Sequence, residues 1–595
     1  MEEQSIQRLI AWGKFQGAAL PEGVSFEYSD RKGIRCVCEK SLSSPYLTIP
    51  DDLIISGKLI PLEFPEADHK RGNTWLKFLL AKMKFGGEEC NSDLSEKFRP
   101  YLDCLPKIVD CPLVWNPREL SHLAGTNLGS SVRPKLKDIL TEWYRFVKEN
   151  EVTEEAAVSS DCSFYKDYGQ LSDESIFRWL VEPLSNGSTL QWSSASAFLW
   201  SHLILLSRAF PHYIIDQNVD QASLMLLPII DLLNHDYHSK VEWGFNEGQF
   251  SFKKLDSIEE DAELCNNYGC KGNEELLSGY GFVLEENPFD FVALKIKLPL
   301  ETITTILKEE PTLKIPTLDD YTNFAFEKQS QNLPNKPEAS VFEDGIVYFI
   351  NKLNASCLDP LLNMFAYLCR GNSEWHSLAS KFNGLQNLRN ALESKLAAAK
   401  SFSSQRDDCS IDSSKYEVNS YRRHCARIYR DGQLSVLKDG LKKLKAMEKT
   451  WLTEYKDRLL TVKKITKYDK GFFGEELPAY FESIDRKQDD VVFENNFELL
   501  VIWILIKIEN NSFIEKHDWV SEQYRNFLID AKNEDITSDR MDPSIESFRR
   551  RMINGTTQTD RTITLKKIVH TFDFVQKNSF TRISSSNPDT IMVRN

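Results

Sequence analysis

The hydrophobic pattern of the chain is most informative between residues 226 and 290. An apolar run from Leu226 to Leu233 ends in the polar triplet Asn234-His235-Asp236. Beyond this run, aromatic residues alternate with other positions at Trp243, Phe245, Phe250 and Phe252. Alternation with a period of two is typical of a half-buried strand. The pattern therefore predicts a buried segment that carries polar side chains at its end, followed by strand structure.

Elsewhere the apolar positions mostly follow helical spacing. Four stretches show it, which are residues 5–13, 73–210, 384–400 and 433–460. The run 499–506 is apolar throughout, and it predicts a buried helix because it is far shorter than the roughly 20 residues of a bilayer span. A β-like region lies between Val24 and Pro50. The pattern alone therefore predicts strands in two parts of the chain and helices in most of the rest.

Several short motifs stand in a fixed order along the chain. Ser207-Arg208-Ala209-Phe210 comes first, and the motifs that follow are Asn234-His235, Tyr268-Gly269, Tyr280-Gly281-Phe282 and Asn287-Pro288. Any one of these dipeptides is uninformative, because it occurs by chance in many proteins. The ordered set resembles the second half of a SET domain. It is similar to the branch that contains the plant Rubisco lysine methyltransferase and the fungal ribosomal-protein lysine methyltransferases.

The resemblance implies an organisation for the whole chain. It implies an α+β fold, in which a SET domain of small β-sheets with a knotted C-terminal thread is interrupted by a helical insert and followed by a helical substrate-binding region. The expected parts are residues 1–70 and 211–292 for the SET domain, 71–210 for the insert, 293–460 for the substrate-binding lobe and 461–595 for a helical extension. No chemical motif is recognisable in that extension.

The same resemblance implies S-adenosylmethionine as the cofactor and assigns roles to particular residues. Tyr268 is the expected catalytic residue. The expected cofactor-binding residues are Lys32, Gly33, Ile34, Arg208, Asn234, His235 and Tyr268. The expected lysine channel is lined by Phe210, Tyr280 and Phe282, with Asp231 at its mouth. Taken singly, each residue has an ordinary structural alternative, such as a strand end for Asn234, a turn for Tyr268 or a helix salt bridge for Arg208.

Methyl transfer to lysine explains why such residues suit the task. The amine must be neutral to attack, although a free lysine has a pKa near 10.4. An apolar aromatic channel favours the neutral form through desolvation, and it also aligns the reacting atoms. The cofactor's sulfonium is a cation, for which aromatic faces and oxygen atoms are suitable partners.

Composition narrows the possible partners and locations. The net charge of −15 argues against a nucleic-acid binder and suits a basic protein partner, although many cytosolic proteins are simply acidic. The twelve cysteines show no pair at zinc-ligand spacing, so no metal and no disulfides are expected. The acidic first residues lack a signal or transit pattern. We expect a soluble monomer that binds no membrane, in the cytoplasm and also in the nucleus.

The substrate stays open at this point. The resemblance favours a large-subunit ribosomal protein. Cytochrome c, an elongation factor and a histone are alternatives within the same chemistry, and a related animal branch methylates histidine rather than lysine. A non-catalytic SET scaffold is an alternative from another class, and the retained Tyr268 and Asn234-His235 speak against it.

Overall fold

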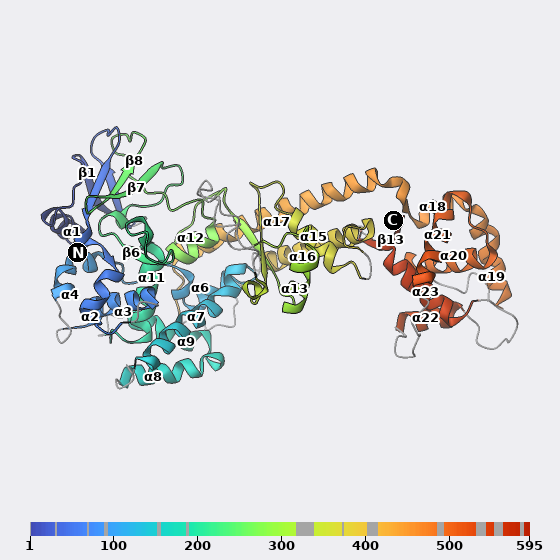
Figure 1. Cartoon of the computed structure of the whole chain (residues 1–595), viewed down its shortest axis with the longest axis horizontal. Helices are drawn as coiled ribbons and strands as arrows, with labels where there is room; N and C mark the ends of the chain where they lie inside the picture. The colour runs from blue at the N-terminus through green and yellow to red at the C-terminus, as the bar shows by residue number, and fades with distance from the viewer. Residues whose placement is uncertain are drawn as a thin grey trace. The chain divides into compact units, whose positions relative to one another are not determined.

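The computed structural model describes most of the chain, in two compact units. The described residues are 2–29, 33–67, 71–87, 93–150, 156–185, 190–316, 338–371, 374–401, 415–484, 493–530, 543–552, 563–583 and 588–594. Among these residues, the first unit comprises 2–292 and 397–436, and the second comprises 293–316, 338–396 and 437–594 (Figure 1). The five-part division expected from the sequence stays a prediction.

Helices form most of the first unit between its strands, as the apolar spacing predicts. The longer ones are α1 (Glu2–Phe15), α3 (Gly72–Phe85), α5 (Arg99–Cys104), α7 (Asn127–Glu149), α8 (Ala156–Lys166), α9 (Asp173–Leu180), α11 (Ala195–Arg208) and α12 (Asn273–Tyr280). Side-chain caps fix where two of them begin, since Thr126 accepts from the N–H of Gly129 and Ser194 accepts from that of Ala197. Phe78 of α3 stacks on Phe146 of α7 with ring centroids 4.0 Å apart.

Three small sheets complete the first unit. Strands β1 (Val24–Ser29) and β2 (Gly33–Cys38) form an antiparallel hairpin. The other two sheets have the orders β3 (Tyr46–Pro50), β8 (Gln249–Lys254), β7 (Val241–Asn246) and β4 (Ile55–Ser56), β6 (Leu224–Leu226), β5 (Phe210–Pro211). Trp243 pairs with Phe252 and Phe245 with Phe250, which confirms the strand prediction. Both β8 phenylalanines are fully buried.

A thread of chain after β8 lies between two earlier segments. On one side, the N–H of Leu264 donates to the carbonyl of Cys36 in β2 at 2.7 Å. On the other side, the N–H of Asn266 donates to the carbonyl of Asn234 at 2.8 Å, and the N–H of Asp236 donates to the carbonyl of Asn266 at 2.9 Å. Three segments far apart in the sequence thereby meet directly before Tyr268.

The second unit is mainly helical. Its longer elements are β9 (Phe291–Ile296, whose first two residues belong to the first unit), α13 (Leu300–Glu309), β10 (Ile346–Asn351), α15 (Asp359–Leu368), α16 (Leu378–Ser401, whose last five residues belong to the first unit), α18 (Val462–Tyr468), α19 (Leu477–Ser483), α20 (Asn496–Asn510), α21 (Asp518–Asp530), α22 (Pro543–Met552) and α23 (Leu565–Lys577). Strands β11 (Leu459–Leu460), β13 (Pro588–Val593) and β12 (Ser579–Ile583) pair in that order. Helix α20 contains the apolar run 499–506 and is buried along most of its length, as predicted.

The helix predicted over 433–460 is longer and starts earlier. It is α17, Ser420–Glu454. The side chain of Asn419 accepts from the N–H of Tyr421 at 2.8 Å, so the helix begins at this cap. None of the described helices is both long enough and apolar enough to cross a membrane.

Candidate active site

Tyr268 lies at the end of the thread and is held at two points. Its hydroxyl donates to the carbonyl oxygen of Leu233 at 2.8 Å. Its backbone N–H donates to Nδ1 of His235 at 3.0 Å. Burial raises the pKa of the Tyr268 hydroxyl well above its usual range, so it stays a neutral donor at physiological pH.

Four rings form a continuous aromatic group, which we call the aromatic wall. His235 stacks on Tyr268 with centroids 5.0 Å apart, and Tyr268 stacks on Tyr280 at 4.9 Å. Phe282 lies 6.1 Å from Tyr280 and 6.3 Å from His235. Burial also raises the pKa of Tyr280 to about 12. The ring faces of the wall attract a cation. Their apolar surroundings also desolvate a bound amine, which favours its neutral form.

His235 is a neutral imidazole, and only one of its two ring nitrogens has a hydrogen-bond partner among the described residues. Burial lowers its pKa to about 4. Because Nδ1 accepts from the N–H of Tyr268, the ring proton is assigned to Nε2. Nε2 is buried and has no hydrogen-bond partner among the described residues. A buried donor without a partner is rare in a folded protein and suits a polar ligand at this point.

Asn234 joins β2 to the thread. Its Nδ2 donates to the carbonyl of Ile34 at 3.0 Å and to Oε1 of Glu263 at 2.7 Å. Gly33, which begins β2, has φ +69°, and apart from its chain neighbours no atom of the described residues lies within 4 Å of the place where a Cβ would be. The described surroundings of this backbone leave room for a ligand. Lys32, which was predicted to contact the cofactor, lies outside the described residues.

Asp231, which was predicted at the mouth of the lysine channel, has several contacts within the first unit. Its side chain is fully buried. The hydroxyl of Tyr101 donates to Oδ2, and Nη1 of Arg208 donates to the backbone carbonyl of Asp231 at 2.9 Å. Burial raises the pKa of the carboxyl to about 6, although the Arg208 charge and the Tyr101 hydrogen bond lower it. The carboxylate therefore faces the protein interior.

Phe210, which was predicted to line the channel, lies in a small sheet. It belongs to β5, where it pairs with Met225 of β6. Its ring packs on Trp243 at 5.1 Å and on Phe250 at 6.1 Å. In the described structure its ring is therefore part of the sheet core, and its place in a lysine channel stays a prediction.

Comparison with known proteins identifies the family. The chain is 41% identical over 604 residues, with full coverage of both chains, to ribosomal lysine N-methyltransferase 1 of Saccharomyces cerevisiae. It is 27% identical over 536 residues to protein-lysine N-methyltransferase EFM1 of the same yeast, covering 86% of this chain and 84% of that protein. The chain belongs to the SET-domain protein-lysine methyltransferase family.

Structural comparison agrees on the fold. The crystal structure of the SET domain of LSMT bound to lysine and AdoHcy superposes with a TM-score of 0.51 at 16% identity, covering 79% of this chain and 97% of that one. Residues 312–455 match the family model described as EFM1 middle domain. The α+β fold with a SET domain and a helical C-terminal region, expected from the motifs, is thus confirmed.

Several residues that shape the site of this methyltransferase were not predicted from the sequence. Oε1 of Glu263 accepts a hydrogen bond from Nδ2 of Asn234, and the hydroxyl of Tyr101 donates one to Oδ2 of Asp231. The side chain of Asn267 builds the turn before the aromatic wall, since Oδ1 accepts from the N–H of Gly269 at 2.9 Å and Nδ2 donates to the carbonyl of Ser239 at 3.0 Å. The pair Asn266-Asn267 before a Tyr-Gly dipeptide is a turn signal that could have revealed this role.

Proposed function

We propose that this methyltransferase modifies lysine side chains of a large-subunit ribosomal protein, with S-adenosylmethionine as the methyl donor. The observation that carries the proposal is the end-to-end 41% identity to a relative named as a ribosomal lysine N-methyltransferase. Similarity along the whole chain includes the regions outside the SET motifs, where a protein substrate would be recognised. The aromatic wall supplies the chemistry that such a reaction needs.

The start of β2 and the neighbouring Asn234 and His235 fit S-adenosylmethionine. The open backbone at Gly33 allows close approach of a ligand, and the unpartnered Nε2 of His235 can donate to an oxygen or nitrogen of it. Asn234 fixes the distance between this strand and the thread through its two hydrogen bonds. S-adenosylmethionine supplies an activated methyl group when bound.

The aromatic wall would prepare the lysine. Rings of Tyr268, Tyr280 and Phe282 exclude water from the amine and so favour its neutral form. Tyr268 keeps a fixed position because its hydroxyl and its N–H are both bound. Fixing the amine and the methyl group in line contributes much of the rate in a displacement of this kind.

Arg208 and Asp231 would act behind the wall. Arg208 donates to the backbone carbonyl of Asp231 and so holds the turn that ends at Leu233. The carbonyl of Leu233 accepts the hydrogen bond from the hydroxyl of Tyr268. We therefore assign Asp231 to positioning and not to direct contact with the target lysine. We likewise assign Phe210 to the packing of the sheet that precedes this turn.

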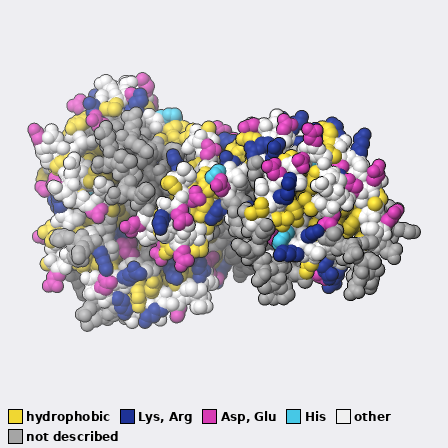
Figure 2. All heavy atoms as spheres, turned by 45° about the vertical axis from the view of Figure 1, so that its right-hand side comes forward, with side chains coloured by type: hydrophobic (Ala, Val, Ile, Leu, Met, Phe, Trp, Pro, Cys, Tyr) yellow, Lys and Arg dark blue, Asp and Glu magenta, His cyan; other side chains and the backbone are white. Residues whose placement is uncertain are grey.

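The charge of the chain is compatible with a basic ribosomal substrate. The net charge is −15, and acidic side chains are interspersed with basic ones over the face shown in Figure 2. An acidic protein meets a basic partner faster than a neutral one does. We propose that the enzyme acts as a monomer in the cytoplasm and also in the nucleus.

A different protein substrate is the second candidate. The match of residues 312–455 to the EFM1 middle domain favours it, because that part of the chain resembles a relative with a different name from the ribosomal enzymes. An elongation factor, cytochrome c and a histone remain the alternatives to test in parallel.

The test is transfer of label from radioactive S-adenosylmethionine to undermethylated ribosomes from cells that lack the enzyme. We expect one labelled large-subunit protein, with the label on lysine, and a loss of at least a hundredfold with Tyr268→Phe. Tyr144→Phe is the matched control, since Tyr144 of α7 stacks on Tyr165 at 4.4 Å in the helical insert. Label on another protein of the extract, and not on ribosomes, would refute the ribosomal protein as the substrate. Absence of both label and cofactor binding would favour a scaffold.

A further inference from the structure

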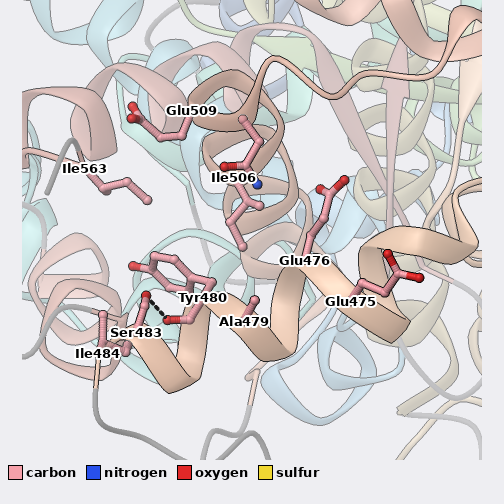
Figure 3. Close-up of a pocket in the computed structure, with 10 residues that line it drawn as sticks. Glu475, Glu476, Ala479, Tyr480, Ser483, Ile484, Ile506, Glu509 and Ile563 are labelled. Carbon is pink, nitrogen blue, oxygen red and sulfur yellow. Dashed lines mark hydrogen bonds between the residues drawn. The ribbon is translucent and has the colours of Figure 1, made fainter.

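The C-terminal part of the second unit contains a cavity that the methyltransferase site does not use. Its volume is about 450 Å³, within the range of roughly 300–1,000 Å³ that ligand pockets occupy. The walls are the π-helical turn Phe472–Glu476, helix α19 and the end of helix α20 (Figure 3). Short π-helical turns are rare and are often found at functional sites.

The lining combines apolar side chains with carboxylates. Ile484, Ile506 and Ile563 form its apolar part. Glu475, Glu476 and Glu509 form its acidic part, and none of the described lining residues is a lysine or an arginine. A long side chain with an apolar stem and a cationic head matches this combination.

The two lysines beside the cavity only partly balance its charge. Lys507 is buried and binds Glu476 at 2.8 Å and Asp469 at 2.9 Å. Lys567 pairs with Glu509. Glu475 is exposed and forms no ion pair within the described part of the chain. Negative charge is therefore left over at the cavity, and Oε2 of Glu476 has no hydrogen-bond partner among the described residues.

Tyr480 adds an aromatic face to the cavity. Its hydroxyl donates to the carbonyl of Met552 at 2.8 Å, which anchors the end of the side chain. Figure 3 shows its ring among the lining side chains, on the same side as Ile563. A ring beside carboxylates attracts a cation through its π-face as well as through charge.

We propose that this cavity binds a lysine or arginine side chain, together with a neighbouring apolar side chain, from a basic segment of the protein substrate. The inference rests on the proposed function in that it assigns the segment to the ribosomal substrate. It gives the C-terminal extension a role in recognition at a place separate from the lysine that is methylated. A second contact of this kind raises affinity for the whole protein without any change in the chemistry.

Two substitutions test the cavity in the full-length enzyme. Glu475→Lys reverses its unpaired charge, and Ala479→Trp fills it from an exposed position of α19. Glu482→Lys is the matched control, because Glu482 is exposed on the same helix but is not one of the lining residues. Steady-state methyl transfer to undermethylated ribosomes gives KM and kcat for each variant.

We expect both cavity variants to raise KM for the ribosomal substrate about tenfold with kcat unchanged, since they remove binding and not chemistry. Glu482→Lys should leave both constants within twofold of wild type. An unchanged KM in both cavity variants, or an equal rise in the control, would overturn the inference while leaving the proposed function intact.

A binding experiment separates this inference from the reaction. The probe is a fluorescein-labelled peptide of alternating lysine and leucine, compared with the same peptide carrying glutamate for lysine. Fluorescence anisotropy should show binding of the lysine peptide that both cavity variants weaken about tenfold. Such binding without methylation of ribosomes would support the cavity as a binding site and refute the ribosomal protein as the substrate. Equal binding of the lysine peptide by wild type and both variants would refute the cavity.

Discussion

Replacing Gly281 by alanine should destabilise the turn inside the aromatic wall by roughly 2–5 kcal/mol. Gly281 follows helix α12 with φ +81°, and its N–H donates to the carbonyl of Leu276 at 3.0 Å. A residue with a Cβ pays about 1–2 kcal/mol for this left-handed conformation. The added Cβ would also lie 2.8 Å from the backbone carbon of Asp110, and overpacking of this kind costs about 1–3 kcal/mol.

The consequence for activity follows from the neighbours of Gly281. Tyr280 and Phe282 flank it, and both belong to the aromatic wall. Backbone atoms of Asp110 have little freedom to withdraw, so the turn must shift instead. A misplacement of about 1 Å near a reacting group can cost a hundredfold in rate. We therefore expect Gly281→Ala to lower kcat at least about tenfold.

Gly279→Ala provides the matched control two residues earlier. Its Cβ would lie 3.9 Å from Cγ of Leu206, an ordinary contact, and Gly279 has no left-handed backbone. Alanine in a helix interior is favoured over glycine by about 1 kcal/mol. Calorimetric melting and amide hydrogen exchange of α12 should show a Tm several degrees lower for Gly281→Ala and no loss for Gly279→Ala. Equal melting and exchange in the two variants would refute the reasoning.

Three further substitutions test buried titratable groups. Asp231 has a pKa raised to about 6, so its protonated form stabilises the fold at low pH, and up to about 3 kcal/mol is lost as pH rises from 4 through 6. Thermal melting should show that the stability of Asp231→Asn relative to wild type is higher at pH 7.5 than at pH 4.5. The same stability difference at both pH values would contradict this. His235 has a pKa lowered to about 4, so stability is lost as pH falls from about 6.5 through 4. His235→Phe should cost about 1–3 kcal/mol at pH 7.5, because the N–H of Tyr268 loses its acceptor, and the deficit should shrink at pH 5 in the same melting assay. Lys507→Met should cost about 3–5 kcal/mol by leaving buried carboxylates unpaired, and urea unfolding should show partial recovery when Asp469→Asn is added.

Local pattern was sufficient to predict many of the elements. The leucine stripe at 384–400 lies within α16, and the apolar run at 499–506 lies within α20. The alternating aromatics form β7 and β8. Helical and strand periodicity depend on neighbours a few residues apart, so one chain segment contains the information. The ordered motifs added the family, because chance seldom produces them all in sequence.

The places that the sequence left open were places of long-range contact. The start of α17 depended on the cap of Asn419, and the hydrogen-bond partner of Asp231 is Tyr101, 130 residues away in the chain. The ring of Phe210 packs on Trp243 of β7 and Phe250 of β8, which the local pattern did not indicate. Single-residue roles follow from what surrounds a side chain, and those surroundings come from other segments.

By itself, the sequence determined the type of most elements, the SET motifs and their order, and the aromatic character of the site. Only the tertiary structure brought Gly33, Asn234 and Tyr268 to one place, through hydrogen bonds that join three distant segments. Only it gathered Glu475, Glu509 and Ile563 around one cavity. The physical reason is that such pairings depend on which surfaces bury each other when the chain folds, and local periodicity does not specify them.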